Sequence, residues 1–212
     1  MTISNTRPRR GRPPKTERGF EDTREALLRQ GMVVLTEQVF SSTGLDSILK
    51  AVGVPKGSFY HYFPSKEAFG LAVLERYDAY FAAKLDYHLL DDRFTPLQRL
   101  RHFADDARAG MEKHGFRRGC LAGNLGQEVS VLPESFRERI GAVFTNWQRR
   151  VEALLEEARD NGTLTADADC AALAEYFWIG WEGAVMRARL TANDAPLELF
   201  VERFIAGLPQ TR

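Results

Sequence analysis

Two short helical segments joined by a glycine turn constrain the fold of this chain more than any other feature of its sequence. Apolar residues recur at helical spacing from Leu45 to Leu49, and Gly53 follows in a Val-Gly-Val turn, where glycine readily takes a positive φ. Pro55 then suits the first turn of another helix, which is predicted to continue to His61. This arrangement predicts a helix-turn-helix in an all-α protein.

The residues around this motif predict further helices. Helical periodicity begins near Asp22, and Asp22 or Thr23 is the expected N-cap of the first helix. Thr43 is placed to cap the second helix of the unit. Ser65 is placed to cap a longer fourth helix, which is expected to reach about Leu85.

The third predicted helix combines a buried face with a polar one. Phe59 and Phe63 lie four residues apart and share the buried face, so that Tyr60, His61 and Tyr62 point elsewhere. An aromatic-rich core helix is the alternative interpretation, but a core helix does not place three polar-tipped rings beside lysines. A recognition helix presents such groups to phosphates and base edges. We therefore predict a DNA-binding surface here.

The positive charge of the chain is concentrated at its N-terminal end. Residues 1–66 contain 11 Lys and Arg against 6 Asp and Glu, although the whole chain has no net charge. Residues 1–19 lack apolar periodicity, and we expect a flexible basic arm there. Arg9, Arg10 and Arg12 lie in or beside an Arg-Gly-Arg-Pro stretch that resembles the core of AT-hook peptides, and such arginines suit a narrow minor groove. A solvated basic tail is the alternative.

Residues 67–212 continue with helical periodicity and no strand pattern of useful length. Long helices are predicted after Pro96, after Pro133 and from Cys170 to Leu190, and one more follows near the C-terminus. Over a hundred residues of aromatic-rich helix beyond the DNA-binding motif predict a second function for this region.

Residues 22–85, above all the stretch from Gly53 to Phe69, resemble the DNA-binding domain of TetR-type repressors. The resemblance implies an all-α homodimer. A helix-turn-helix domain, here residues 20–66, would bind a double-stranded DNA operator. A helical domain, here residues 67–212, would bind a small-molecule effector and dimerise through its last two long helices. The predicted DNA-contacting residues are Arg9, Arg10, Arg12, Thr43, Lys56, Gly57, Ser58, Tyr60, His61, Tyr62 and Lys66.

One position departs from the family pattern. Gly44 stands where many members carry a threonine that touches phosphate, so any contact there would come from the backbone.

A glycine-rich segment interrupts the helices of the second region. Residues 115–128 contain four glycines, and we expect them to form a poor helix. Together with residues 177–184, they resemble a TetR subgroup that contains an acrylate-responsive repressor and the electrophile-sensing repressor of N-ethylmaleimide reductase. The resemblance implies an unsaturated carboxylate such as acrylate, or its coenzyme A thioester, as the effector.

Cys120 lies in this segment after two arginines that could stabilise a thiolate or pair with a carboxylate. A thiolate would add to electrophiles or oxidise reversibly, which makes a redox- or electrophile-sensing repressor the second hypothesis. A small buried hydrophobe is the alternative interpretation of this cysteine. The predicted effector-pocket residues are Phe103, Arg117, Arg118, Cys120, Phe144, Trp147, Tyr176 and Trp181.

The sequence lacks the patterns of an enzyme or a membrane protein. Its paired aspartates are adjacent and so do not face each other on a helix, and its four histidines lack a metal-ligand spacing. No phosphate loop is present, and no apolar run approaches the roughly 18 residues that span a bilayer. Two cysteines are too few for a disulfide framework. We expect no catalytic residue, cofactor or metal, no membrane contact, and a cytoplasmic location.

Two other functions are alternatives to a ligand-gated repressor. An architectural DNA-binding protein would share the basic arm but would not need the long second region. A small helical enzyme would need a convergent acid, base or nucleophile, and no such motif is found.

Overall fold

The computed structural model describes residues 17–211, and within them all regular structure is helical apart from one isolated bridge between Leu164 and Gln210. This confirms the predicted all-α fold. No helix in this part of the chain is long and apolar enough to cross a membrane. The helices are α1 Glu17–Glu37, α2 Leu45–Val52, α3 Lys56–Phe59, α4 Lys66–Leu89, α5 Pro96–Lys113, α6 Leu121–Gln127, α7 Glu134–Asp160, α8 Cys170–Thr191 and α9 Ala195–Gly207.

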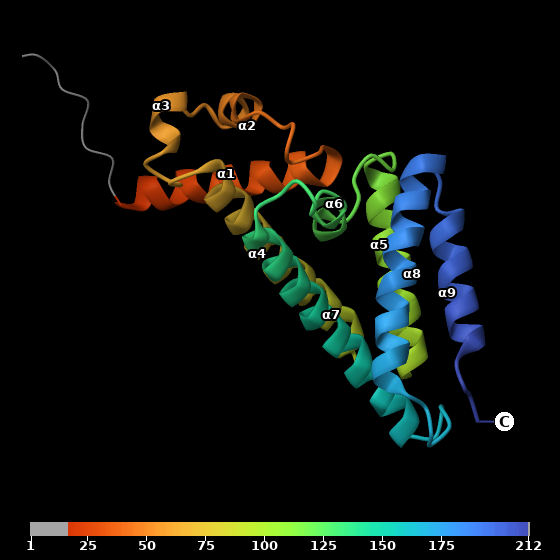
Figure 1. The fold of residues 1–212 in the computed structure, drawn as a ribbon. Coiled ribbons are helices and arrows are strands. Elements are labelled where there is room, and N and C mark those ends of the chain that lie inside the picture. The colour runs from red at the N-terminus through yellow and green to blue at the C-terminus, as the bar shows by residue number, and fades with distance from the viewer. Residues whose placement is uncertain (1–16, 212) are drawn as a thin grey trace, which may run out of the picture.

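The helices form a small N-terminal unit on top of a larger bundle (Figure 1). Helices α1, α2 and α3 lie together at one end, and α4 runs from this unit to the far end of the molecule. Helix α4 packs along α7, while α8 packs between α7 and α9. The short α6 lies beneath α1, where the two parts of the molecule meet (Figure 1).

Aromatic packing holds the N-terminal unit on α4. Phe59 and Phe63 are both buried, as their spacing predicts, and their rings lie 5.6 and 5.0 Å from that of Phe69 on α4. Gly53 ends α2 with a φ of 69°, a conformation that disfavours side chains. Ser65 caps α4 by accepting a hydrogen bond from the Ala68 N–H at 3.0 Å.

Three expectations for this unit are wrong. Helix α1 begins at Glu17, so Thr23 lies inside it and its hydroxyl donates to the Gly19 carbonyl instead of capping. Thr43 does not cap α2, because its hydroxyl donates back to the Val39 carbonyl and Gly44 occupies the N-cap position. Helix α3 ends at Phe59 rather than His61, and the chain leaves it in a turn.

The boundaries of the long helices agree closely with the sequence. Pro96 opens α5 behind a Thr95–Gln98 capping box, and Pro133 directly precedes α7. Helix α8 begins at Cys170, after Asp169 caps it through the Ala172 N–H. The glycine-rich segment differs from expectation, because residues 121–127 do form the helix α6. The neighbouring helices α1, α4 and α7 pack on it and outweigh its low helix propensity.

A buried hydrogen-bond centre joins α4 to α7. Asp78 on α4 accepts from the indole Nε1 of the fully buried Trp147 at 2.9 Å and from Asn146 Nδ2 at 3.2 Å. Arg139 lies 3.4 Å from the other carboxylate oxygen. Asp86 lies further along α4 and instead forms an ion pair with Arg150, in which both side chains are partly exposed.

These two aspartates give a stability prediction. Asp78→Ala should lower the free energy of unfolding by about 2–3 kcal/mol, because it leaves the Trp147 indole N–H buried without a partner. Asp86→Ala, the matched control, should lower it by about 0–1 kcal/mol, since its ion pair is solvated. Urea unfolding of both variants at one protein concentration measures the difference, and equal losses would contradict this account.

Candidate DNA-binding surface and effector cavity

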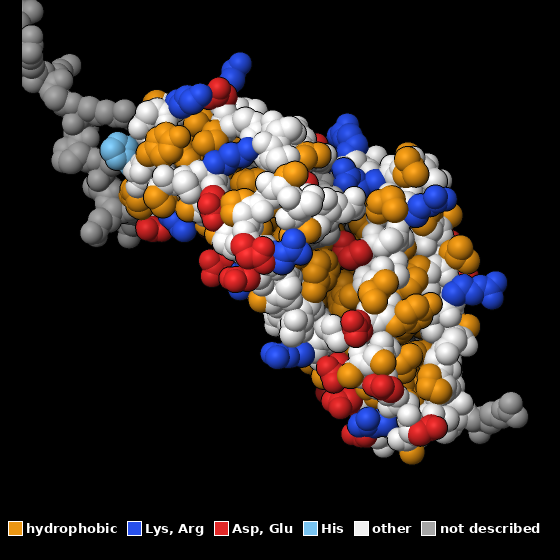
Figure 2. Space-filling model, viewed as in Figure 1, with side chains coloured by type: hydrophobic (Ala, Val, Ile, Leu, Met, Phe, Trp, Pro, Cys, Tyr) orange, Lys and Arg blue, Asp and Glu red, His pale blue; other side chains and the backbone are white. Residues whose placement is uncertain are grey.

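Helix α3 and the turn after it present polar side chains to solvent. Lys56, Gly57, Tyr60 and His61 are exposed, and Ser58 is half-buried. Lys56 is held by an ion pair with Asp46 of α2 at 3.0 Å, in which both side chains are more than two-thirds exposed. Figure 2 shows lysine and arginine side chains on the outer surface of this unit. Lys56, Gly57, Tyr60 and His61 are therefore accessible from solvent, as the predicted DNA contacts require.

Two other predicted DNA contacts already have partners in the protein. The Tyr62 ring stacks on Phe20 of α1, with centroids 4.7 Å apart. Lys66 donates to the Ser41 carbonyl at 3.0 Å and lies over the Phe40 ring. Both are half-buried, so they support the unit as well as bordering its surface.

Thr43 is a correction to the predicted surface. Its side chain is buried and its hydroxyl donates to the Val39 carbonyl, so Thr43 is not on the exposed surface that the prediction assumes. Arg9, Arg10 and Arg12 lie outside the described residues.

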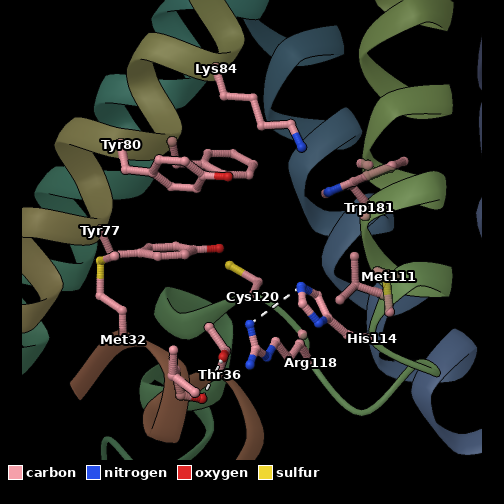
Figure 3. Close-up of a pocket in the computed structure, with 16 residues that line it drawn as sticks. Met32, Thr36, Tyr77, Tyr80, Lys84, Met111, His114, Arg118, Cys120 and Trp181 are labelled. Atoms are coloured by element: carbon pink, nitrogen blue, oxygen red, sulfur yellow. Dashed lines mark hydrogen bonds between the residues drawn. The ribbon is translucent and has the colours of Figure 1, made fainter. Parts of the chain in front are cut away.

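A cavity of about 300 Å³ lies where α1, α4, α5, the loop before α6 and α8 meet (Figure 3). Its walls are mainly apolar, with Met32, Phe81 and Met111 from three different helices among them. The side chains of Tyr77 and Cys120 point toward each other in its lining (Figure 3). The cavity therefore touches both the N-terminal unit and the bundle.

Three of the predicted pocket residues line this cavity: Arg118, Cys120 and Trp181. The other five do not. Phe103 and Trp147 are fully buried in the bundle core, and Phe144 packs on Trp147. Tyr176 is 59% exposed on the outer side of α8, and Arg117 is exposed beside the loop. Helical spacing placed Phe103, Phe144 and Trp147 on inward-facing helix faces, but these three rings pack against other side chains instead of bordering the cavity.

Sequence reasoning missed the cavity residues of α4 and α5. Tyr77, Phe81 and Lys84 follow one another at spacings of four and three on α4, and Met111 and His114 lie three apart at the end of α5. This spacing marks a helix face. It does not tell whether that face meets a cavity or a packed core.

A buried titratable cluster lies at one wall. Burial, and then the charge of Glu182, raise the pKa of the Cys120 thiol well above its ordinary value. Burial likewise raises the pKa of Tyr77, and it raises that of the Glu182 carboxyl to about 7. Cys120 Sγ accepts from the Gly123 N–H at 3.3 Å. At neutral pH the thiol and the phenol are therefore both protonated.

Gly123 leaves room for the Glu182 side chain in this cluster. A Cβ at this position would clash with the Glu182 carboxylate, which leans over the first turn of α6. The Glu182 Oε1 atom is buried and has no hydrogen-bond partner among the residues described by the structure.

Positively charged side chains border the cavity. Arg118 Nε donates to Glu37 Oε1 at 2.8 Å, and its Nη1 lies 3.3 Å from His114 Nε2. Lys84 pairs with Asp106 of α5 at 2.8 Å. The hydrogen bond from Arg118 lowers the pKa of Glu37, so this pair is fully ionised at neutral pH.

The loop and α6 also hold the C-terminal end of α1. The Gly119 N–H donates to the Thr36 carbonyl at 3.0 Å. The Asn124 amide donates to the carbonyls of Leu35 and Thr36, and Arg189 of α8 reaches that of Glu37 at 3.3 Å.

Just beyond α1, the Glu128 carboxylate accepts from the backbone N–H groups of Phe40 and Ser41 at 2.7 and 2.8 Å. The loop before α6 thus lines the cavity through Arg118, Gly119 and Cys120 and also holds the end of α1 through the Gly119 N–H.

The outer side of α8 and α9 carries exposed apolar side chains. Tyr176, Ile179, Met186 and Leu190 recur along α8 at helical spacing, and Leu199 lies on α9. Figure 2 shows hydrophobic side chains along these helices. Such a stripe is typical of a helix-pairing surface, as the sequence predicts for the last two long helices.

Two family models match this chain. "Bacterial regulatory proteins, tetR family" matches residues 27–73, and "Tetracyclin repressor-like, C-terminal domain" matches residues 96–204.

Individual proteins agree with these models. The chain is 53% identical over 201 residues to the transcriptional regulator AcuR of Cereibacter sphaeroides, covering 93% of this chain and 90% of that protein. The crystal structure of a regulatory protein TetR from Rhodobacter sphaeroides matches with a TM-score of 0.85 at 53% identity, over 88% and 98% of the two chains. That of E. coli NemR in its reduced form matches with a TM-score of 0.82 at 33% identity, over 90% and 98%. The chain therefore belongs to the TetR family of bacterial transcriptional regulators, in the subgroup that includes AcuR and NemR.

Proposed function

We propose that this TetR-family repressor binds a near-palindromic operator as a homodimer and is released from it by a small unsaturated carboxylate, such as acrylate or the acyl end of its coenzyme A thioester. One observation carries the proposal. The cavity is lined by the loop that holds the end of α1, so a molecule bound there acts directly on the support of the DNA-binding unit.

The lining of the cavity favours a small acid with an apolar tail. Arg118 and Lys84 supply positive charge for a carboxylate, while Met32, Phe81 and Met111 supply apolar contacts. A cavity of about 300 Å³ admits a small acid but not coenzyme A itself, so only the acyl end of a thioester would enter. The resemblance to the acrylate-responsive subgroup supports the same class of ligand.

Binding would be reversible. The raised pKa of the buried Cys120 keeps its thiol protonated at neutral pH, and the thiol is a much weaker nucleophile than the thiolate. An effector releases the repressor only through its preference for the arrangement in which the two recognition helices are badly spaced for DNA.

Covalent sensing at Cys120 is the second candidate, and the position of Cys120 in the cavity lining favours it. In that route the sulfur bonds to the β-carbon of an unsaturated carbonyl compound, and the thiol proton moves to the α-carbon. A solved relative, E. coli NemR, is described as a reduced form.

A single substitution separates the two routes. Cys120→Ser should retain most of the acrylate response, because a hydroxyl can replace the thiol in a reversible site. Release of a fluorescent operator fragment, together with intact-mass measurement of the treated wild type, checks this. Abolished release with a wild-type adduct would favour the covalent route, and no release by acrylate or its thioester would exclude the proposed effector.

The DNA-binding surface gives another prediction. Tyr60→Ala and Lys56→Ala should both weaken operator binding while leaving the dimer intact, since both side chains are exposed on the surface around α3. Lys56→Ala should also reduce the salt slope of binding by about 1, because it removes one phosphate contact. Tyr87→Ala, an exposed tyrosine at the far end of α4, is the matched control. Unchanged binding of either variant would contradict the proposed contacts.

The basic arm predicted from the sequence is tested by deletion. Removal of residues 1–18 takes away six basic residues, so it should reduce operator affinity and flatten its salt dependence. The loss should be largest on operators with A·T-rich flanks, where the minor groove is narrow. Fluorescence anisotropy across a salt series measures both quantities. Equal affinity and an equal slope on such flanks would exclude a role for the arm.

A further inference from the structure

Arg118 faces the cavity and the DNA-binding unit at the same time. It lines the cavity, and its Nε donates to Glu37, the last residue of α1, at 2.8 Å. The two side chains are 30% and 29% exposed, so the ion pair is largely shielded from solvent. It joins the proposed effector site to the end of α1, the first helix of the DNA-binding unit.

We propose that the carboxylate of the effector takes Arg118 away from Glu37, so that breaking this ion pair is the step that loosens α1. The inference rests on the proposed function. It assigns the release from DNA to one step, in which Arg118 exchanges Glu37 for the effector carboxylate.

The other groups at the cavity would not transmit the same signal. Lys84 pairs with Asp106 on α5, so a ligand that captured Lys84 would leave the contacts of α1 unchanged. Burial and the neighbouring Arg118 lower the pKa of His114, which is therefore uncharged at neutral pH. Among the charged groups that line the cavity, Arg118 is the one whose partner lies on α1.

The effector carboxylate and Glu37 would compete for one guanidinium. A guanidinium binds a carboxylate in a planar, two-pronged manner, and two carboxylates beside one guanidinium repel each other. Glu37 is partly exposed, so it can return to water when it is released. A carboxylate bound inside an apolar cavity is not solvated by water, so pairing with the Arg118 cation stabilises it more than it stabilises Glu37.

The exchange would also disturb the backbone hold on α1. Gly119 follows Arg118 directly, and its N–H donates to the Thr36 carbonyl. A shift of Arg118 toward the cavity therefore affects a hydrogen bond and an ion pair on neighbouring residues of the same helix end. Effector binding and operator binding are linked thermodynamically. A change that weakens the Arg118–Glu37 pair should therefore raise the affinity for the effector and lower the affinity for the operator.

Glu37→Gln tests this exchange, because the exchange and a positioning role for Glu37 predict opposite changes in acrylate affinity. If the effector must break the pair, removing the competing charge should tighten acrylate binding by about two- to fivefold, as for an ion pair of this exposure. The operator affinity without acrylate should fall by a similar factor. If Glu37 only positions Arg118 for the ligand, acrylate binding should weaken instead. Calorimetric titration with sodium acrylate, with intact mass checked for adducts, measures the first quantity.

A matched control comes from the same helix. Glu25 of α1 pairs with Arg76 Nε at the same distance of 2.8 Å and at similar exposure, but neither residue lines the cavity. Glu25→Gln should therefore leave the acrylate affinity unchanged. Acrylamide, which has the same shape without the charge, should bind the wild type and Glu37→Gln equally. Arg118→Gln should lose most acrylate binding and keep acrylamide binding.

The outcomes separate this inference from the proposed function. Acrylate that binds the wild type but binds Glu37→Gln equally or more weakly overturns the exchange and leaves the proposed effector standing. A wild type that neither binds acrylate or its thioester nor leaves the operator in their presence overturns the proposed effector, and with it the exchange.

Discussion

The last turn of α1 leaves backbone carbonyls that its own helix cannot satisfy, and the bundle supplies their donors. Gly119, Asn124 and Arg189 donate to the carbonyls of residues 35–37, although they lie more than 80 residues away in sequence. Glu128 satisfies the N–H groups just beyond the helix. Because a buried unpaired backbone group is costly, these bonds fix the DNA-binding unit on the bundle.

The cavity is a consequence of this junction. Helix α6 must lie close under α1 to make these bonds, and the loop before it carries Arg118, Gly119 and Cys120 into the space between α4, α5 and α8. Apolar walls and a small number of charged groups remain around this space. Under the proposed function, a ligand bound there would contact residues of the loop that supports the DNA-binding unit, and its binding energy would act on DNA release.

The buried cluster next to the cavity restricts its chemistry. Cys120, Tyr77 and Glu182 lie together with little access to water, so each is driven toward its neutral form. A neutral thiol and a neutral phenol can donate hydrogen bonds to a bound ligand, whereas a thiolate would repel a carboxylate. This environment is suited to recognition of an anion by Arg118 more than to nucleophilic attack.

The sequence by itself determined the local structure. Gly53, Pro55 and the Phe59–Phe63 spacing defined the helix-turn-helix, and Ser65, Pro96 and Pro133 marked where three long helices begin, because caps, turns and helical periodicity are set by residues near in the chain. The stretch from Gly53 to Phe69 was sufficient to identify the family.

Tertiary structure decided which residues border the cavity. Trp147 and Phe103 fill the core, while Tyr77, Phe81 and Lys84 face the cavity. It also decided that Thr43 is buried, that residues 121–127 become helical, and that Arg118 meets Glu37. Helical periodicity predicts that one face of a helix is buried. Which residues pack on that face depends on contacts between residues far apart in sequence, and these contacts form only when the helices pack.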